Sequence, residues 1–483
     1  MNLKFQSAQP AALVQQENNM FKLPIDKIPT HIFRTYDIRG NTLKDLTADL
    51  AHDIGLALGS EALAHGAKNI IVARDGRLSG PHLFEALTEG LLKTGINILD
   101  IGVVPTPLLY FATNHLEFNT GVMLTGSHNP RDDNGLKTVL NGKTLSGDRI
   151  QDLLKRIQTR NAVSGVGVRS HYDHIIADYI KDVASRIKLA RPLKIVVDAG
   201  NGVTGVVIPE LYRALGCEVT ALFCEVDGNF SNHHPDPAKP ENLAVIIDTV
   251  AKQKADIGLA FDGDGDRLGV VTSKGEIIYP DRQLMLLARD LLEREPGAKI
   301  VFDVKCSKNL AAVIEAAGGI PIMSKTGHSI LKQRMYDEKA PLAGEMSGHI
   351  FFRENWYGFD DGMYAGARVL EILAKGSATS SALFESVPDS ISTPEINVNI
   401  ADDAKYALIE KLQKHANFPN AKIINIDGLR IEFPHAWGLV RASNTTPMLT
   451  LRFEADDEAA LMDVKKVFRE FLLSQSPDLK LDF

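Results

Sequence analysis

Six consecutive residues, Asp262 to Arg267, carry the strongest chemical signal in the sequence. They read Asp-Gly-Asp-Gly-Asp-Arg, so three carboxylates alternate with glycines and end at a guanidinium. Two unit charges about 4 Å apart repel by roughly 4 kcal/mol at an effective dielectric near 20, so this loop favours a bound cation. In an extended segment the alternation would place the three carboxylates on one side, and the glycines would let the backbone bend around an ion.

Mg²⁺ suits this loop best, because it takes a few carboxylate oxygens and keeps coordination positions for water or phosphate. The calcium-binding EF-hand pattern requires Gly and Glu at loop positions where this chain has Arg267 and Ser273. The flanking segments 257–261 and 268–272 also have the apolar character of strands. We therefore predict a magnesium loop between two strands, with a solvated acidic turn as the alternative.

A second segment, Thr125 to Pro130, offers a nucleophile. It follows the apolar run 121–124, so we expect Ser127 on a loop at the end of a strand. The esterase pattern G-x-S-x-G is absent, and His128 follows the serine directly. A phosphorylated serine fits better, because its charge of about −1.5 to −2 would be attracted to a metal loop and to basic groups. An ordinary capped turn stays open as the alternative.

Basic side chains are available to balance such a phosphoserine. We expect a turn at Asn134 and Gly135 that brings Lys137 back toward Ser127. Four further residues are weaker candidates for the same site, and these are Tyr36, Arg39, Lys305 and His328.

Two polar loops later in the chain suit a phosphorylated sugar. Residues 344–349 read Gly-Glu-Met-Ser-Gly-His, so Glu345 and Ser347 could bind neighbouring sugar hydroxyls as acceptor and donor. His349 carries an imidazole, which could move a proton. Residues 441–447 read Arg-Ala-Ser-Asn-Thr-Thr-Pro, which places a guanidinium, hydroxyls and an amide where they could hold a phosphate. Polar loops without a ligand are the alternative for both segments.

A glycine-rich segment at 200–205 suggests a different function. It matches G-x-G-x-x-G after a predicted strand and before a predicted helix, with the acidic Glu225 downstream, which is typical of dinucleotide binding. A tight turn between strand and helix explains the same glycines. We favour the turn, since a dinucleotide site would leave the acidic loop unexplained, but an NAD(P)-dependent oxidoreductase remains an alternative.

The composition is that of a globular protein with several domains, because 44% of its 483 residues are hydrophobic and 24% are charged. A net charge of −8 argues against a general nucleic-acid surface. The three cysteines lack C-x-x-C spacing and predict free thiols in a reducing compartment. No apolar run reaches the roughly 18 residues of a membrane span. We expect a cytoplasmic protein that binds neither nucleic acid nor membrane.

A strand followed by a polar turn and an amphipathic helix recurs three times. The strands at 69–73, 194–197 and 299–302 each lead within two residues to an aspartate, and the spacing of these units predicts three α/β domains. From about 389 the sequence becomes β-rich, which predicts a smaller α+β domain. Ligands of open α/β sheets gather at the carboxyl ends of strands. The predicted divisions are an N-terminal extension (1–27), domains with the Ser127 loop (28–173), the acidic loop (174–276) and the Glu345 loop (277–388), and a fourth domain (389–483).

Together these motifs resemble the α-D-phosphohexomutases, and specifically the bacterial phosphomannomutase/phosphoglucomutase group. The similarity runs from about Phe33 to the C-terminus, while residues 1–27 depart from the family. It implies three consecutive α/β/α domains with mixed sheets and a smaller C-terminal α+β domain around a central cleft. The segments that carry it are 36–40, 125–130, 262–267, 344–349 and 441–447.

The resemblance also implies site residues. Asp262, Asp264 and Asp266 would bind Mg²⁺ together with a phosphoryl oxygen on Ser127. We place His128 among the catalytic candidates as the neighbour of that serine. The other implied catalytic residues are Lys137, Arg39, Arg267 and His349, and the implied substrate-binding residues are Tyr36, Lys305, His328, Glu345, Ser347, Arg441, Ser443, Asn444 and Thr445.

The implied reaction interconverts hexose 1-phosphate and hexose 6-phosphate, of mannose or glucose or both, through a hexose 1,6-bisphosphate that also acts as activator. The similar phosphoglucosamine mutases usually have Gln where Met346 stands and Ser-Gly-Thr where 443–445 read Ser-Asn-Thr. Such a mutase is therefore an alternative, and a non-catalytic sugar-phosphate-binding protein is another. We expect a monomer or a weak dimer.

Overall fold

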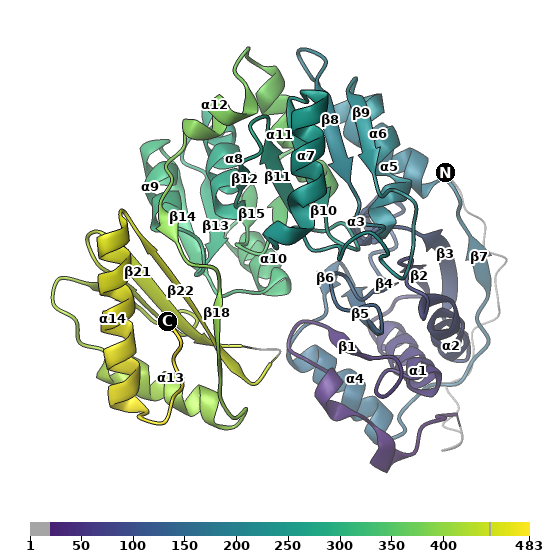
Figure 1. The fold of residues 1–483 in the computed structure, drawn as a ribbon. Helices are drawn as coiled ribbons and strands as arrows, with labels where there is room; N and C mark the ends of the chain where they lie inside the picture. Colours follow the sequence, from purple (N-terminus) through teal and green to yellow (C-terminus); the bar gives the residue numbers. More distant parts are fainter. Residues whose placement is uncertain (1–19, 444–445) are drawn as a thin grey trace. The chain divides into compact units, whose positions relative to one another are not determined.

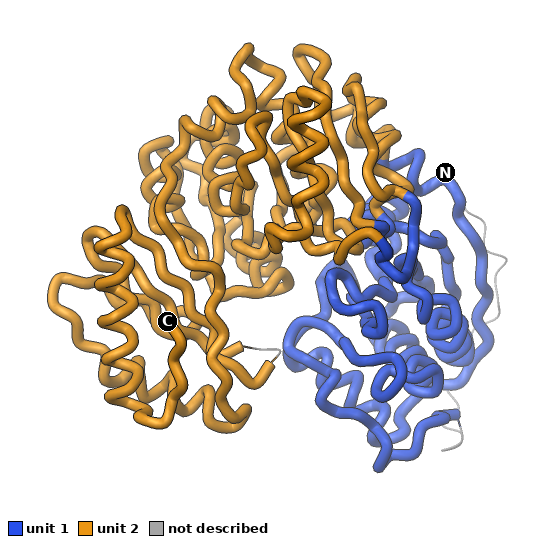
Figure 2. Tube along the Cα trace, in the orientation of Figure 1, with its two compact units in different colours: residues 1–179, 201–203, 225–231 blue, residues 180–200, 204–224, 232–483 orange. Residues whose placement is uncertain are grey.

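A computed structural model describes residues 20–443 and 446–483 (Figure 1). The chain divides into two compact units (Figure 2). Among the described residues, one unit contains 20–179, 201–203 and 225–231, and the other contains 180–200, 204–224 and the rest from 232 onward. Within the described ranges, no helix has both the length and the apolar character needed to cross a lipid bilayer.

The first unit is built on a mixed sheet with strand order β1-β5-β4-β2-β3-β7, and β6 pairs with β5. The strands β2, β3, β4 and β7 are parallel, whereas β5 is antiparallel to both β1 and β4. The strands are β1 (Ile38–Asn41), β2 (Asn69–Arg74), β3 (Asn97–Val103), β4 (Gly121–Leu124), β5 (Asp133–Leu140), β6 (Lys143–Thr144) and β7 (Arg169–His171).

Helices α1 and α2 form the tightest helix pair of this unit. A Cβ at Gly55 would lie 2.3 Å from the carbonyl oxygen of Leu87, and one at Gly90 would lie 2.0 Å from that of His52, so glycine is required at both positions. The apolar core beneath them includes Leu50, Ile54 and Val72. The helices are α1 (Ala48–Ala64), α2 (Gly80–Leu92), α3 (Thr106–His115) and α4 (Asp148–Gln158), with short 3₁₀ turns η1 (Ile25–Lys27) and η2 (Thr30–Ile32). Helix α5 (Ile175–Arg186) begins in this unit, and its residues from Ile180 onward belong to the second.

The second unit begins with a five-stranded sheet of order β12-β11-β10-β8-β9. The strands β8, β9 and β10 are parallel, and β11 turns back antiparallel to β10. Its elements are β8 (Lys194–Asp198), η3 (Val203–Val206), α6 (Ile208–Ala214), β9 (Glu218–Leu222), η4 (Pro240–Leu243), α7 (Ala244–Gln253), β10 (Ile257–Phe261), β11 (Leu268–Thr272) and β12 (Ile277–Ile278).

A four-stranded sheet of order β14-β13-β15-β16 follows in the same unit. Again the first strands are parallel, and β16 returns antiparallel to β15. Its elements are α8 (Pro280–Arg294), β13 (Lys299–Asp303), α9 (Lys308–Ala316), β14 (Ile320–Ser324), α10 (His328–Asp337), β15 (Leu342–Gly344), β16 (Ile350–Phe352), α11 (Gly362–Ala374) and α12 (Ser380–Glu385).

The last sheet of the second unit is antiparallel throughout, with order β17-β22-β21-β20-β19 and with β18 also paired to β22. Two helices, α13 and α14, pack on its core side, where Leu412 and Phe468 are fully buried. Its elements are β17 (Ile391–Ser392), β18 (Ile396–Asn399), α13 (Ala404–His415), β19 (Lys422–Ile424), β20 (Leu429–Glu432), β21 (Ala436–Ala442), β22 (Met448–Ala455) and α14 (Glu458–Gln475).

The first three sheets repeat one arrangement. A central strand (β2, β8 or β13) pairs in parallel with the next strand and with the first strand of an antiparallel hairpin (β4–β5, β10–β11 or β15–β16). The recurring strands predicted from sequence are these central strands, and the fold class of three α/β domains plus a C-terminal α+β domain is confirmed. The domain boundaries stay predictions, and β12 extends the second sheet slightly beyond the predicted end at 276.

The glycine-rich segment 200–205 serves packing. A Cβ at Gly205 would lie 2.1 Å from the carbonyl oxygen of Cys224, and Gly200 adopts a φ of +52°. The backbone N–H of Gly200 donates to Asp198 at the end of β8 (2.8 Å). Both glycines are thus accounted for by the turn that follows the strand.

Asp198 also binds a histidine. Nε2 of His233 lies 3.2 Å from both carboxylate oxygens of Asp198, and Nδ1 lies 3.0 Å from the backbone oxygen of His234. Both ring nitrogens therefore face acceptors, an arrangement that suits the doubly protonated ring. Burial disfavours the charged ring, but the hydrogen bond and charge of Asp198 outweigh it and raise the pKa of His233.

This pair predicts a pH-dependent contribution to stability. Because the folded-state pKa of His233 is raised, its contribution is complete below the unfolded value of about 6.5 and is lost as pH rises through the folded-state pKa. In urea unfolding across this pH range, His233→Gln should lower the unfolding free energy by about 1 kcal/mol on the acidic side and by less at alkaline pH. The exposed His82→Gln is the control. An equal effect of His233→Gln at every pH would contradict the prediction.

Candidate active site

The predicted phosphoserine loop is the connection of the β4–β5 hairpin. Ser127 is buried in this connection and has a φ of +49°, a left-handed conformation that is uncommon for residues other than glycine. Its Oγ lies 3.1 Å from Nδ1 of His128, and its backbone N–H donates to Oγ1 of Thr125 (2.9 Å). The loop therefore has a specific conformation that a flexible turn would lack.

The predicted turn at Asn134 and Gly135 is wrong. Both residues lie inside β5, where Gly135 pairs with Arg39 and Asn134 pairs with Gly40 of β1. A Cβ at Gly135 would lie 2.5 Å from the carbonyl oxygen of Ile38, so this glycine permits the close approach of β1 and not a chain reversal. The chain reverses earlier, at the serine loop itself.

Asp75 and Arg77, which follow β2 in the chain, hold the serine loop in place through hydrogen bonds. The guanidinium of Arg77 donates to four backbone oxygens of the loop region, those of Ser127 (2.7 Å), Asn129 (2.7 Å), Pro130 (2.6 Å) and Asp133 (2.8 Å). The carboxylate of Asp75 accepts from the Thr125 hydroxyl (2.8 Å) and from the Gly126 N–H (3.1 Å). Because Asp75 and Arg77 are both buried and ion-paired, the clamp is shielded from solvent.

The other predicted residues of this unit lie around the same hairpin. Arg39, on β1, donates to the Asn129 side chain (2.7 Å) and pairs with Asp37 (2.7 Å). Lys137 is buried on β5 opposite Met123 of β4. Tyr36 and His128 are half-buried. The structure thus brings Arg39 to the serine loop and places Lys137 on the strand that leaves it.

The acidic loop connects β10 to β11, as predicted, but it is not extended. The backbone N–H groups of Gly265 and Arg267 both donate to Oδ1 of Asp262, at 3.0 and 3.1 Å, and Gly265 has a φ of +80°. The expected one-sided extended segment is therefore wrong, because the Asp262 carboxylate caps a turn. Carboxylate oxygens of Asp262, Asp264 and Asp266 still lie within 4.8 Å of one another, and all three residues are fully buried.

These three carboxylates fit a divalent cation. They offer only hard oxygen ligands at short separations. The Arg267 guanidinium lies beside this cluster, with Nε 4.0 Å from Asp262. Burial opposes the Arg267 cation, but Asp262 and Asp266 outweigh it and raise its pKa. The acidic cluster can hold a metal ion.

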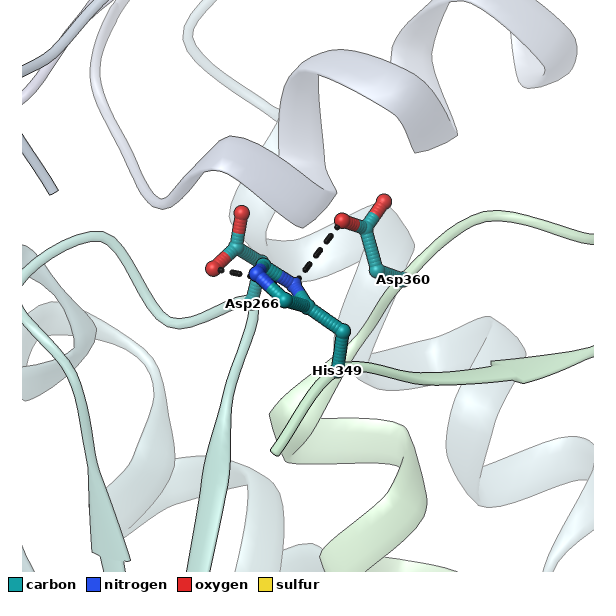
Figure 3. A group of neighbouring side chains, drawn as sticks. All are labelled: Asp266, His349 and Asp360. Carbon is teal, nitrogen blue, oxygen red and sulfur yellow. Dashed lines mark ion pairs between the residues drawn. The ribbon is translucent and has the colours of Figure 1, made fainter. Parts of the chain in front are cut away.

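His349 links the acidic loop to the β15–β16 hairpin (Figure 3). Its Nδ1 lies 3.5 Å from Asp266 and 3.1 Å from Asp360. Its Nε2 accepts from Nε of Arg267 (3.0 Å). The backbones of Arg267 and His349 also form an isolated β-bridge. The ring of His349 stacks on that of His328, with centroids 5.5 Å apart. The structure therefore brings four of the predicted residues, Asp266, Arg267, His328 and His349, together.

The predicted sugar loop is the connection between β15 and β16. Glu345 is buried, accepts from the Ser347 hydroxyl (2.7 Å) and also accepts from the backbone N–H of Gly327, next to His328. The backbone N–H of Met346 donates to Asp303 at the end of β13 (3.1 Å). Glu345 is thus hydrogen-bonded both to Ser347 and to the backbone of Gly327, the residue before His328.

Lys305 lies on the loop after β13, where residues of the last sheet hold the backbone. Arg430 donates to the carbonyl oxygens of Val304 and Cys306 (2.6 Å each), and Arg452 donates to that of Lys305 (2.7 Å). The Lys305 ammonium donates to Glu395 (2.8 Å). Burial opposes the Lys305 cation, but Glu395 and Asp303 outweigh it and raise its pKa.

The predicted phosphate turn joins β21 to β22. Arg441 is buried at the end of β21, and its Nε donates to Asp427 (3.1 Å). Ser443 accepts from the hydroxyl of Thr446 (2.8 Å). The predicted residues Asn444 and Thr445 lie outside the described residues. All four predicted site loops are therefore hairpin connections, although the juxtaposition of Ser127 with the acidic loop stays a prediction.

Four sequence profiles of one family match this chain along its length. They are described as phosphoglucomutase/phosphomannomutase alpha/beta/alpha domains I, II and III and C-terminal domain, and they match residues 30–163, 173–275, 279–391 and 395–471. The chain belongs to the phosphoglucomutase/phosphomannomutase family. The predicted superfamily is confirmed.

Relatives of known name agree with this membership. The chain is 54% identical over 456 residues to a phosphomannomutase/phosphoglucomutase of Pseudomonas aeruginosa, covering 94% of this chain and 98% of the relative. It is 52% identical to a phosphoglucomutase of Neisseria gonorrhoeae, covering 92% and 98%. A solved phosphoglucomutase/phosphomannomutase family protein of Burkholderia thailandensis is 50% identical, covers 94% and 100%, and superposes with a TM-score of 0.90. The predicted enzyme class, a phosphohexomutase, is confirmed.

Sequence reasoning missed three positions that hold the site, namely Arg77, Asp360 and Asp427. Arg77 belongs to the polar turn Arg-Asp-Gly-Arg at the end of β2. Its charged residues at the end of a strand could have marked it as a candidate site residue from the sequence alone. Asp360 belongs to an Asp-Asp pair before α11, where Asp361 caps the helix by accepting from the N–H of Tyr364. The partner of Asp360, His349, is remote in sequence, so no local pattern reveals its role.

The Arg77 clamp predicts that this residue is needed for the stability of the serine loop. Arg77→Met should lower the unfolding free energy by about 3 kcal/mol, because it removes the ion-pair partner of the buried Asp75 carboxylate and the guanidinium donor of four carbonyl oxygens. Arg131→Met, which removes an exposed guanidinium at the rim of the same loop, should change it by less than about 0.5 kcal/mol. Urea unfolding of the variants measures both, and equal effects would contradict the clamp.

Proposed function

We propose that this phosphohexomutase interconverts hexose 1-phosphate and hexose 6-phosphate, of mannose or glucose or both, with Ser127 as the phosphoryl carrier. The observation that carries the proposal is the serine loop, where a buried Asp75–Arg77 pair fixes the hairpin connection that bears Ser127. Family membership supplies the reaction type.

Phosphoryl transfer asks the protein mainly for positioning and charge neutralisation. In the forward half, the bond between phosphorus and Oγ of Ser127 breaks, and a new bond forms to the free hydroxyl of the sugar. The sugar hydroxyl loses a proton and Oγ gains one. The resulting 1,6-bisphosphate reorients, and its other phosphoryl group returns to Ser127. Arg39, Lys137 and Arg267 would carry the positive charge around the transferring group.

Asp262, Asp264 and Asp266 would hold a Mg²⁺ ion in this scheme. Bound there, the ion would neutralise charge on the phosphoryl group of Ser127. Asp262 is prepared for this role, because its Oδ1 is already fixed by two backbone N–H groups of its own loop.

The bisphosphate must be bound in two orientations, and the layout of the second unit suits this. Arg441 and Ser443 would bind the phosphate that is not reacting, whichever end it is on. Glu345 and Ser347, already oriented by their mutual hydrogen bond, would bind hydroxyls that both orientations share. Lys305 and His328 would complete the recognition of the sugar phosphate, and Tyr36 and His128 would lie at the transferring end.

Removing the carrier hydroxyl should abolish turnover. Ser127→Ala should lower the rate of glucose 1-phosphate isomerisation roughly 10³-fold or more, measured in a coupled assay with added glucose 1,6-bisphosphate. Intact-mass spectrometry should find one added phosphate on the wild type and none on the variant. Ser164→Ala, in an exposed loop, is the control, because Ser164 is a serine that carries no phosphoryl group in the proposed reaction. Full activity of Ser127→Ala would refute the proposed function.

The acidic loop predicts a requirement for a divalent cation. Chelation should remove activity, and added Mg²⁺ should restore it. Asp264→Asn should raise the Mg²⁺ concentration needed for half-maximal activity by roughly tenfold or more, and it should weaken the stabilisation of the fold by Mg²⁺ in thermal unfolding. Asp248→Asn, an exposed residue of α7, is the control. Turnover that is insensitive to chelation would count against the metal site.

A further inference from the structure

Lys305, one of the predicted substrate-binding residues, is already paired with an anion of the protein itself. Its ammonium donates to Oε1 of Glu395 at 2.8 Å. The two side chains differ in burial, because that of Lys305 is 10% exposed and that of Glu395 is 43% exposed. A carboxylate that faces solvent therefore covers an ammonium that does not.

An irregularity in the last sheet of the second unit places Glu395 at this ammonium. From Ser392 to Ile396 the chain advances four residues, whereas their partners on β22 are only three residues apart. An extra residue of this kind is a β-bulge, which redirects side chains and is frequent beside active sites. The bulge lies in the segment 393–395, between β17 and β18, and so includes Glu395.

The lysine of this pair is held in place from its backbone. Arg452 donates to the carbonyl oxygen of Lys305, and Arg430 donates to the carbonyl oxygens of the residues before and after it. A buried ammonium is costly unless an anion or another acceptor faces it. The Lys305 ammonium is thus a fixed cation that needs an anionic partner at this position.

Glu395 is influenced by the cations that the proposed function assigns to the phosphate of the ligand. The charge of Lys305 is the largest cause that lowers the pKa of Glu395, and the charges of Arg441 and Arg452 add to it against partial burial. The carboxylate is therefore ionised at neutral pH. It takes the electrostatic place that a bound phosphate would take.

We propose that Glu395 is a competing anion, whose carboxylate occupies the Lys305 ammonium until a phosphate group of the ligand displaces it. This inference rests on the proposed function. A phosphate carries more negative charge than a carboxylate at neutral pH and has three terminal oxygens, so it is the stronger partner for a fixed cation. Glu395 can return to water at small cost, because ion pairs of exposed groups contribute little.

A permanent pair, in which Glu395 orients Lys305 for the ligand, is the competing explanation. A permanent partner of a buried cation is expected to be buried with it. Asp75 and Arg77 are such a pair, with side chains 3% and 1% exposed. Glu395 differs from Asp75 in its exposure, which favours displacement. The two explanations predict opposite effects on ligand binding when the charge of Glu395 is removed.

Displacement suits a bisphosphate that must leave its site and turn. When a phosphate group leaves Lys305, Glu395 takes its place, so the buried ammonium keeps a partner while the ligand reorients. The free-energy difference between the bound ligand and the turning ligand is thereby reduced. Glu395 would weaken binding of the ligand and speed its reorientation, and a sugar without a phosphate would not break the pair.

Ligand binding without turnover tests the direction of the effect. In a Ser127→Ala background, Glu395→Gln should lower the Kd for glucose 6-phosphate roughly tenfold in titration calorimetry, because Lys305 loses its competing anion. The control Glu338→Gln removes the partner of Lys299 (2.6 Å), a lysine–glutamate pair elsewhere in the same unit, and should leave the Kd unchanged. Unchanged or weaker binding in Glu395→Gln would overturn the proposal.

A double-mutant cycle shows whether the gain in affinity comes through Lys305. In a Lys305→Met background, Glu395→Gln should lower the Kd by no more than about twofold, since the cation for which the two anions compete is gone. An equal gain with and without Lys305 would trace the effect to the general loss of a negative charge and would refute the competition.

Turnover kinetics provide a second measurement. With Ser127 intact, Glu395→Gln should lower KM and kcat together, because a ligand that is held more tightly turns more slowly. A kcat that stays unchanged while KM falls would overturn the part of Glu395 in reorientation.

These measurements also distinguish the inference from the proposed function. An active mutase in which Glu395→Gln weakens the binding of glucose 6-phosphate would refute the inference alone. A protein without mutase activity in which Glu395→Gln tightens that binding through Lys305 would refute the function and leave the competition standing.

Discussion

Buried carboxylates at the ends of parallel strands are the constraint on which the site depends. A buried carboxylate must be satisfied by donors, and the donors nearest to a strand end belong to the neighbouring loops. Asp75 takes N–H and hydroxyl groups of the serine loop, and Asp303 takes the N–H of Met346 in the sugar loop. Asp198, at the same place in the second sheet, takes His233 instead. The requirement to satisfy these acids therefore shapes the loops that carry the chemistry.

The repetition of one sheet pattern explains why the site loops are all connections of antiparallel hairpins. Each of the first three sheets ends its parallel strands with an antiparallel hairpin, and the hairpin connections carry Ser127, the acidic triplet and the Glu345 loop. A hairpin connection is fixed by two hydrogen-bonded strands, so it can present a side chain more rigidly than a long crossover loop. The fourth sheet uses a hairpin as well, for the turn after Arg441.

Local patterns in the sequence predicted much of this, and contacts between distant segments account for the rest. The strands 121–124, 257–261 and 268–272 were predicted with their observed ends, because apolar runs bounded by glycine and polar residues specify them locally. The Asn134–Gly135 turn failed, because the approach of β1 to Gly135 outweighs the turn preference of that dipeptide. The extended acidic loop failed because Asp262 finds backbone donors in its own turn.

Hydrogen bonds join the third and fourth sheets at the loops that carry the predicted sugar and phosphate residues. Arg430 and Arg452 together bind three successive carbonyl oxygens of the Lys305 loop, and both guanidiniums lie over the ring of Trp437. Asp427 accepts from Arg441 and from the N–H of Thr326, two residues before His328. The predicted phosphate cradle and the predicted sugar loops therefore share hydrogen-bonded supports. Under the proposed function, these shared supports would keep the phosphate cradle and the sugar loops at the same spacing for both orientations of the bisphosphate.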